Sequence, residues 1–396
     1  MKTQLGTPEL GESVAPRRRR GLRPGVTTGT CAAAAAKAAC LSLRGVAVPS
    51  VSLRVPAGVT VELAVKSLVR AEMTARASVI KDAGDDPDVT HGAEVGARVT
   101  LIGEPIRLRA GWHVVGEGVV SCRLAPGSVI SLVAGRGVGV VTRPGLGIPV
   151  GGPVINPVPR RMIAAAVRDS LEQLPPSIRV EVFVVGGEAL AQRTLNARLG
   201  VVGGLSILGT TGIVRPYSTA AWRASVLQGV DVAAAAAVGC VVASTGGRSE
   251  KYARRRYPEL PDVAFVEMGE FTGHLLLRAR QRQVPRVVLA GFIGKLSKIA
   301  NGNFMTHVAG NQVDLRYLAG VAQRAGAPPA LVAATRTANT ARHVQELVLN
   351  AGTTPFFDLV CVDVRDRCEQ FVGSAPRVGV LLFDFDGELL GSAGSV

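Results

Sequence analysis

Residues 287–295 read VVLAGFIGK, and this stretch decides the fold expected for the second half of the chain. Its first part, Val287 to Ala290, is a short apolar run typical of a buried strand, and the glycines that follow indicate a tight turn. Lys295 then stands beside the expected start of a helix, where backbone N–H groups and a cation favour a carboxylate or phosphate. Ligands of open α/β sheets collect beyond the carboxyl ends of the strands, so the stretch predicts a ligand site at this turn.

Similar apolar runs lie before and after this stretch and alternate with helical patterns. They are Val180 to Val185, Val263 to Val266, Leu359 to Val364 and a final run, Val378 to Phe385. Such alternation is typical of a parallel sheet with helices on both faces. We therefore predict a doubly wound, Rossmann-like α/β domain over residues 156–396.

The first half of the chain shows a different pattern. Thr27 to Thr30 is expected to cap an alanine-rich helix, Cys31 to Leu43, and alternating runs such as those at 51–55, 59–65, 97–102 and 129–133 predict strands. We therefore predict an α+β domain over residues 22–155, joined to the second domain by the proline- and glycine-dense passage at 143–159. Residues 1–21, which include the run Arg17 to Arg20, are predicted to form a disordered basic tail.

Composition and charge limit the classes of partner. A formal charge of +15 attracts polyanions, which include nucleic acid, anionic membrane and small molecules with several carboxylates. Only 4% of the residues are aromatic, which disfavours stacking platforms for nucleic acid, and no apolar stretch of about 20 residues predicts a membrane span. The six cysteines form no C-x-x-C pair, so we expect neither a zinc site nor a disulfide framework, but a reduced, cytoplasmic protein.

Two further glycine-rich turns are candidate sites for a nucleoside or carboxylate. One lies in residues 203–212 and the other in residues 243–250, where Glu250 is placed to pair with ribose hydroxyls. Each has a plain alternative, because a tight turn need not bind anything and Glu250 can serve as first-turn helix charge. The chain has neither a Walker A loop nor a G-x-G-x-x-G fingerprint, which disfavours nucleotide hydrolysis and dinucleotide redox chemistry. The predicted cofactor-binding residues are Gly209, Thr210, Thr211, Gly212, Gly246, Gly247 and Glu250.

An acidic loop at residues 81–92 contains four carboxylates and a histidine. Crowding of like charges is expected to raise the pKa of one carboxyl group until it can act as a general base. Asp82, Asp86 and His91 have no recognised ligand spacing, which disfavours a metal site. A site for a hard cation and a plain turn rich in Asp, Gly and Pro are the alternatives that stay open. The predicted catalytic residues are Asp82, Asp85, Asp86 and His91. Of the other histidines, His307 is the better candidate for a site, and His274 is expected to be structural.

Several long motifs of this chain resemble those of the CbiD family. They are residues 22–31 with the alanine-rich helix, 139–145, 155–160 and 209–216, and the resemblance extends over about residues 22–385. It implies a methyltransferase that uses S-adenosylmethionine to methylate cobalt-precorrin-5B at ring carbon 1, giving cobalt-precorrin-6A in anaerobic cobalamin biosynthesis. Val26 stands where the family is expected to have an aromatic residue, and residues 247–249 also depart from the expected turn.

The resemblance and the residues together predict how the ligands are held. A corrinoid carries several carboxylates, which suits an arginine-rich enzyme, and we expect it to face the acidic loop and the helix start at Thr27. The predicted substrate-binding residues are Thr27, Thr28, Thr30, Lys81, Lys295, Thr306 and His307. We expect S-adenosylmethionine at the second-domain turns, no protein-bound metal, and no nucleic-acid or membrane partner. The alternatives are a methyltransferase for another tetrapyrrole and a non-catalytic polyanion-binding protein, whose affinity would fall steeply with salt.

Overall fold

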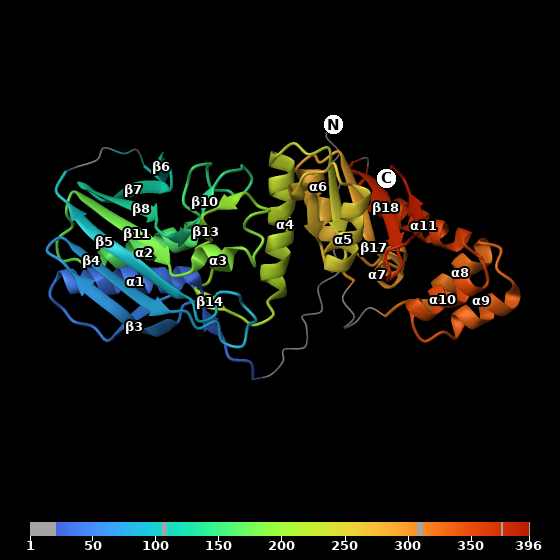
Figure 1. Cartoon of the computed structure of the whole chain (residues 1–396), viewed down its shortest axis with the longest axis horizontal. Helices are drawn as coiled ribbons and strands as arrows, with labels where there is room; N and C mark the ends of the chain where they lie inside the picture. The colour runs from blue at the N-terminus through green and yellow to red at the C-terminus, as the bar shows by residue number, and fades with distance from the viewer. Residues whose placement is uncertain (1–20, 105–107, 109, 307–311, 374, 396) are drawn as a thin grey trace, which may run out of the picture. The chain divides into compact units, whose positions relative to one another are not determined.

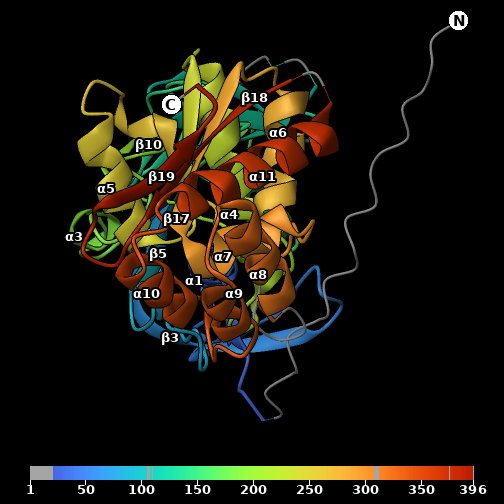
Figure 2. The same ribbon diagram turned by 90° about the vertical axis from the view of Figure 1, so that its right-hand side faces the viewer.

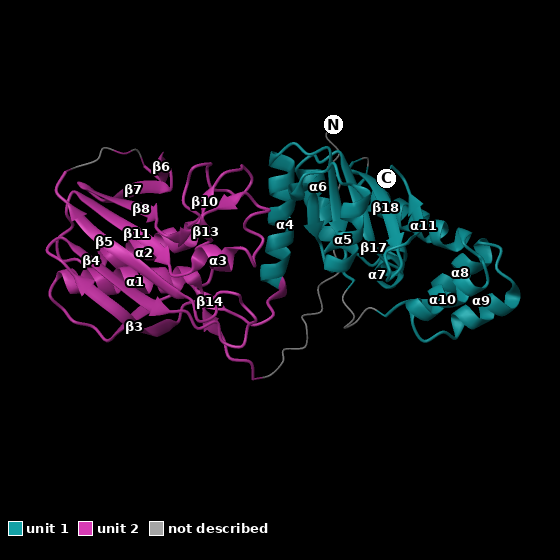
Figure 3. Cartoon of the chain, viewed as in Figure 1, with its two compact units in different colours: residues 1–18, 220–396 teal, residues 19–219 magenta. Residues whose placement is uncertain are grey.

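The computed structural model describes residues 21–104, 108, 110–306, 312–373 and 375–395. The basic run Arg17 to Arg20 therefore lies outside the described residues. The chain divides into two compact units, one built from residues 19–219 (unit 2) and one that contains residues 220–396 (unit 1) (Figure 3). Each unit is described below by itself.

Unit 2 is built on an eight-stranded sheet with the order β2-β3-β4-β5-β11-β8-β7-β6. Neighbouring strands are antiparallel, except that β11 runs parallel to β8. The strands are β2 (Ser50–Arg54), β3 (Thr60–Arg70), β4 (Thr74–Ile80), β5 (Glu94–Ile102), β6 (His113–Gly116), β7 (Val119–Ala125), β8 (Ser128–Ala134) and β11 (Ser177–Val184). Two-residue strands form three small pairs: β1 (Gly25–Val26) with β14 (Ile213–Val214), β9 (Gly137–Val138) with β13 (Gly204–Leu205), and β10 (Val140–Val141) with β12 (Val201–Val202).

One face of this sheet is covered by the helices α1 (Thr28–Leu43) and α2 (Pro157–Arg168) (Figure 1). The alanines of α1 are fully buried, and their small side chains allow the helix to lie close to β4 and β5. The expected helix and its cap at Thr27 are thus confirmed. The short helix α3 (Gly187–Ala191) packs against β9 and β13.

The run Val180 to Val185 was expected to form a strand of the second domain, and the structure corrects its place. It forms β11, which lies between β5 and β8 because its buried residues complete the core of unit 2. The division between the units therefore falls after residue 219 and not after residue 155. The passage at 143–159, which we expected to be the linker, lies inside unit 2.

Unit 1 contains a five-stranded sheet with the order β16-β15-β17-β18-β19, in which only β19 is antiparallel to its neighbour. The strands are β15 (Cys240–Ser244), β16 (Phe265–Glu267), β17 (Arg286–Phe292), β18 (Arg377–Phe383) and β19 (Leu389–Ala393). The helices are α4 (Thr219–Ala235), α5 (Gly247–Arg256), α6 (Thr272–Gln281), α7 (Ile293–Ala300), α8 (Leu315–Arg324), α9 (Pro329–Arg336), α10 (Ala341–Asn350) and α11 (Pro355–Val372), and a 3-10 turn lies at Asp262–Ala264.

Helices cover both faces of this second sheet. Ala253 and Tyr257, on and just after α5, pack with Val242, Val288 and Leu381. A larger core on the other face joins residues of α4, α6, α7 and α11 to the side chains that alternate with these along the strands. Figure 2 shows α11 of this face beside β18 and β19. The prediction of a chain that mixes helices and strands in both halves is confirmed.

One predicted strand of the second half is wrong, and half of another, because Val263 and Ala264 lie in the 3-10 turn before β16. Leu359 to Val364 lies inside α11, where Val360, Cys361 and Val364 are buried and the residues between them are partly exposed. This spacing belongs to a helix, and a six-residue apolar run cannot by itself distinguish a helix from a buried strand. Among the described residues, no helix is long and apolar enough to cross a membrane.

Candidate functional site

The predicted site residues fall into two clusters, one in each unit. The helix-start cluster, in unit 2, surrounds the first turn of α1 and comprises Arg23, Thr27 to Thr30, Lys81 to His91 and Gly209 to Gly212. The strand-end cluster, in unit 1, lies where β15, β16 and β17 end and comprises Ser244 to Glu250, Glu270, Lys295, Lys298 and Thr306.

The three threonines at the start of α1 are buried and bonded to the protein. Thr27 caps the helix, because its hydroxyl accepts a hydrogen bond from the backbone N–H of Thr30 at 3.2 Å. The hydroxyl of Thr30 donates to the carbonyl oxygen of Gly212 at 2.7 Å, and that of Thr28 accepts from the N–H of Leu208 at 2.9 Å. These side chains therefore hold residues 206–212 against the helix, and contact with a substrate remains a prediction for them.

Gly209 and Gly212 were expected beside a cofactor at the end of a parallel strand of the second domain. They lie instead in unit 2, against the helix start. A Cβ on Gly209 would lie 2.5 Å from the side chain of Thr27, and one on Gly212 would lie 2.6 Å from Val55. Both glycines also have a positive φ, so their lack of a side chain is explained by packing within the protein. Thr210 and Thr211, between them, are exposed.

We expected a raised pKa for one carboxyl group of the acidic loop, and Asp82 does not have it. The guanidinium of Arg23 pairs with both carboxylate oxygens of Asp82, and the N–H of Gly84 donates to one of them at 2.9 Å. The hydrogen bond from Arg23 is the main cause that lowers the pKa of Asp82 to about 2. Arg23, which lies outside the loop, neutralises part of the crowded charge at Asp82. Asp82 is therefore a poor general base.

Lys81 is one of the most deeply buried side chains of the chain, at 1% exposure. Its Nζ donates to Asp88 at 2.5 Å, and the backbone and side chain of Thr90 donate to the other oxygen of that carboxylate at 2.7 and 2.6 Å. Burial would raise the pKa of Asp88, but these hydrogen bonds outweigh it, and the pKa lies below the ordinary value. Lys81 thus fixes the loop, and a contact between Lys81 and the substrate remains a prediction.

The other predicted catalytic residues have weaker attachments to the protein. Asp85 accepts from the N–H of Arg23 at 2.6 Å, and Asp86 accepts from the N–H of Tyr217 at 2.8 Å. His91 is 53% exposed, and its Nδ1 accepts from the N–H of Ala83 at 3.1 Å. A neutral His91 therefore carries its proton on Nε2. Each of these three side chains keeps at least one polar atom that can contact a ligand.

The strand-end cluster begins with Gly246 and Gly247 after β15. The φ of Gly246 is 169°, an extended value that any residue adopts, and a Cβ there would have no atom within 4 Å. A Cβ on Gly247 would meet only Glu267, at 3.8 Å. Neither the backbone nor the packing requires glycine at these two positions, in contrast to Gly209 and Gly212.

Glu250 lies in the first turn of α5 and is buried. Its carboxylate accepts from Nε of Arg254 at 3.0 Å, one helical turn away, and Arg254 also pairs with Asp262 at 2.6 Å. The plain alternative for Glu250, charge in the first turn of a helix, therefore describes its contacts within the protein. A bond from Glu250 to ribose remains a prediction.

Two lysines of α7 contribute positive charge to this cluster, and of these Lys298 is buried and Lys295 partly buried. Lys295 donates to the carbonyl oxygens of Thr245 at 2.6 Å and Gly269 at 3.3 Å, and Lys298 donates to that of Thr306 at 3.3 Å. Burial lowers the pKa of both lysines. Lys298 was not among the predicted site residues, because it stands between apolar positions of a helix. His307, which was predicted, lies outside the described residues.

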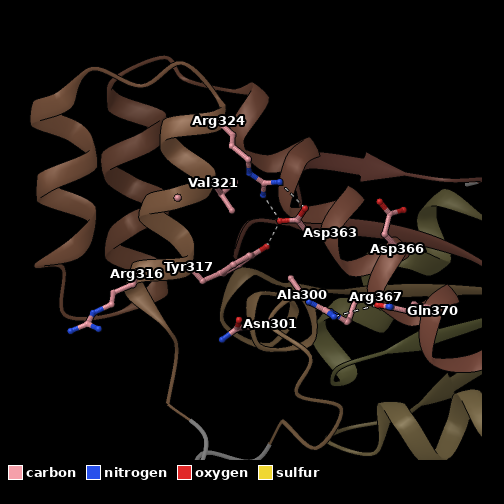
Figure 4. A pocket seen from close by; sticks show the side chains of 11 residues that line it. Ala300, Asn301, Arg316, Tyr317, Val321, Arg324, Asp363, Asp366, Arg367 and Gln370 are labelled. Atoms are coloured by element: carbon pink, nitrogen blue, oxygen red, sulfur yellow. Dashed lines mark hydrogen bonds and ion pairs between the residues drawn. The ribbon is translucent and has the colours of Figure 1, made fainter. Parts of the chain in front are cut away.

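A pocket of about 650 Å³ lies in unit 1 between α8, α11 and the end of α7 (Figure 4). Its main acidic group, Asp363, accepts from the hydroxyl of Tyr317 at 2.7 Å and pairs with Arg324, so these contacts tie α8 to α11. No predicted site residue lines this pocket. The part of the chain that the structure describes contains no group of three or more His, Cys, Asp or Glu side chains placed to hold a metal ion.

Two family models match this chain, one over its first half and one near its C-terminus. The family model described as CbiD matches residues 15–216, and the one described as CbiD, C-terminal domain, matches residues 305–394. A crystal structure of the cobalamin biosynthesis protein (cbiD) from Archaeoglobus fulgidus is 24% identical and covers 84% of this chain and 85% of that chain. Its TM-score of 0.36 is too low to support a conclusion about the fold.

Relatives with a functional name are similar to nearly the whole chain. The cobalt-precorrin-5B C(1)-methyltransferases of Salinispora arenicola and Thermus thermophilus are 47% and 46% identical to it. The first alignment covers 96% of each protein and the second 94% of each. The protein of the same name from Geobacillus kaustophilus is 44% identical over 95% of both chains.

Proposed function

The chain belongs to the CbiD family, and we propose that it is a C-methyltransferase that methylates cobalt-precorrin-5B at ring carbon 1 in cobalamin biosynthesis. One observation carries this proposal: relatives that bear this name are 44% to 47% identical over at least 94% of the chain. The proposed methyl donor is S-adenosylmethionine, as the name methyltransferase implies.

We propose that the strand-end cluster binds the methyl donor. In doubly wound sheets a nucleoside ligand lies beyond the carboxyl ends of the central strands, and we assign unit 1 to that Rossmann-like class. Gly246 and Gly247 support this proposal, because their open surroundings allow a ligand to approach the backbone closely. Glu250, held by Arg254, is then the group that would bond the ribose.

We propose that the helix-start cluster contacts the corrinoid. The exposed side chains of Thr210 and Thr211, together with His91, would bind it, although the hydroxyl of Thr211 also bonds the backbone of Ile213. Thr27, Thr28 and Thr30 act by positioning the loop that carries those two threonines. Gly209 to Gly212 are thereby reassigned from the donor to the substrate.

Methyl transfer requires the sulfonium carbon and the accepting ring carbon to be aligned at close range, so positioning should supply most of the rate. If a proton must leave the substrate, Asp85, Asp86 or His91 would accept it. Asp82 is a weaker candidate, since its pairing with Arg23 keeps the carboxylate a poor base.

The experiment supplies purified cobalt-precorrin-5B and S-adenosylmethionine with an isotopically labelled methyl group, and follows the label in the corrinoid by mass spectrometry. Asp86→Asn and Thr211→Ala are run beside the unaltered chain. We expect label in the ring, with turnover lowered in both variants. If the folded chain transfers no label to a competent substrate, the proposed activity is wrong.

A further inference from the structure

The strand-end cluster contains lysine N–H donors for which no acceptor is found among the described residues. A lysine ammonium has three N–H donors. Lys295 uses two of them on the carbonyl oxygens of Thr245 and Gly269, and Lys298, which is 7% exposed, uses one on Thr306. Among the described residues, half of the N–H donors of these two lysines therefore lack an acceptor.

Two buried hydroxyl groups in the same cluster also lack partners within the described residues. Thr306 is 1% exposed and its Oγ1 has no hydrogen-bond partner, although its carbonyl oxygen accepts from Lys298. Ser244, the last residue of β15, is fully buried, and its hydroxyl also has no hydrogen-bond partner among the described residues. A buried polar atom without a partner is costly, and such atoms collect where a ligand completes the bonding.

The charges of the two lysines are only weakly compensated. No carboxylate of the described chain forms an ion pair with either ammonium, although Glu267 and Glu270 are near enough to raise the pKa of Lys295. The pKa of Lys295 is nonetheless below its ordinary value, because burial and the neighbouring charge of Lys298 both act against the charged form. Two cations that lie one turn apart on a helix therefore attract an anion.

The position of the two lysines within the sheet supports the same conclusion. Lys295 bonds to residues that follow β15 and β16, while α7 itself follows β17. β15 lies between β16 and β17 in the sheet. After β15 the chain forms β16 on one side of it and then crosses over to form β17 on the other side. This is the switch point at which open α/β sheets bind their ligands.

We propose that Lys295 and Lys298 together bind one carboxylate group of a ligand, with the hydroxyl of Thr306 donating a further hydrogen bond to it. The inference rests on the proposed function, in which both the methyl donor and the corrinoid carry carboxylates. Lys298 becomes a binding residue in this account. The competing explanation is that the lysines only tie the strand ends together, in which case their loss would lower stability and leave ligand binding unchanged.

The test measures binding by the full chain with three probes, using calorimetry and no turnover. S-adenosylhomocysteine carries the donor's carboxylate, 5′-methylthioadenosine has the same nucleoside without it, and cobyrinic acid is a stable corrin polycarboxylate. The variants are Lys298→Met, which keeps the side-chain length and removes the charge, and Thr306→Val, which removes only the hydroxyl. Lys251→Met, at an exposed position of α5, is the matched control.

If the carboxylate belongs to the donor, Lys298→Met weakens S-adenosylhomocysteine about 10-fold to 100-fold and leaves 5′-methylthioadenosine unchanged. If it belongs to the substrate, the same loss is seen with cobyrinic acid alone. Thr306→Val shows a smaller loss with the same probe and retains the unfolding midpoint of the unaltered chain, so it carries the test if Lys298→Met does not fold.

Affinities for all three probes that stay within about twofold in both variants would overturn the proposed carboxylate site. This outcome is distinct from failure of the proposed function, in which the unaltered chain transfers no methyl group although it binds these probes as expected.

Discussion

Lys81 in the helix-start cluster and Lys298 in the strand-end cluster are both buried lysines, but only the first faces a carboxylate. Lys81 pairs with Asp88, whereas the described partner of Lys298 is one carbonyl oxygen. The threonines differ in the same way, because Thr30 donates to Gly212 and the hydroxyl of Thr306 has no described partner. A motif rich in polar residues can therefore have a structural role. The better candidates for ligand binding are buried polar groups whose hydrogen bonds the protein itself does not complete.

The largest difference is expected when each lysine is replaced by methionine. Lys81→Met leaves the half-buried Asp88 without its cation and should lower the free energy of unfolding by about 3–5 kcal/mol. Lys298→Met removes a buried charge that has no carboxylate partner among the described residues, so stability should be unchanged or higher. Denaturant unfolding of both variants checks this, and equal losses would remove the distinction between the clusters.

Glycines provide the second comparison. Gly209→Ala places a Cβ against Thr27 at a positive φ and should cost about 2–4 kcal/mol. Gly246→Ala enters open space at an extended φ, so it should cost less than about 1 kcal/mol and weaken donor binding. Thermal unfolding and donor titration on the same samples separate the two effects. A strongly destabilised Gly246→Ala would show that this glycine serves packing as well.

A smaller effect is expected from the threonine hydroxyls. Thr30→Val removes a buried bond to the carbonyl oxygen of Gly212 and should cost about 1–2 kcal/mol. Thr306→Val removes a hydroxyl that has no described partner and should cost nothing. Equal destabilisation of the two valine variants in chemical denaturation would contradict the proposed difference between these hydroxyls.

The smallest effect concerns pH. The pKa of Asp82 is lowered to about 2, from an ordinary value of 3.8, mainly by its bond to Arg23. Because the folded-state pKa is the lower one, the stability that this pair contributes is present above about pH 4 and is lost as the pH falls toward 2. Asp82→Asn should therefore be slightly less stable than the unaltered chain at pH 6, with the gap closing below pH 4. A gap that stays constant to pH 2 would contradict this assignment.

Local features were predictable from the sequence because their causes lie within a few residues. The cap at Thr27 depends on a hydrogen bond to a residue three positions along the chain, and the helix that follows depends on its own run of small side chains. The strand and turn at residues 287–295 were predictable for the same reason, as was the place of Lys295 at the start of α7.

The features that were missed depend on pairing between distant residues. Nothing within Val180 to Val184 tells that β11 pairs with β5 and β8, and nothing within residues 203–212 tells that they pack on α1. Arg23 lies about 60 residues from Asp82, so its effect on that carboxylate could not be deduced from the loop alone. Lys298 carried one signal that could have been used, a lysine set among the buried apolar positions of a short helix.

The most direct test of the account is the position of the transferred methyl group. The full chain is incubated with cobalt-precorrin-5B and S-adenosylmethionine whose methyl carbon is ¹³C, and the corrinoid product is analysed by mass spectrometry and carbon NMR. The account predicts one added methyl group, attached to ring carbon 1. Label at another ring carbon, or none in a product mixture that still contains intact substrate and donor, would contradict it.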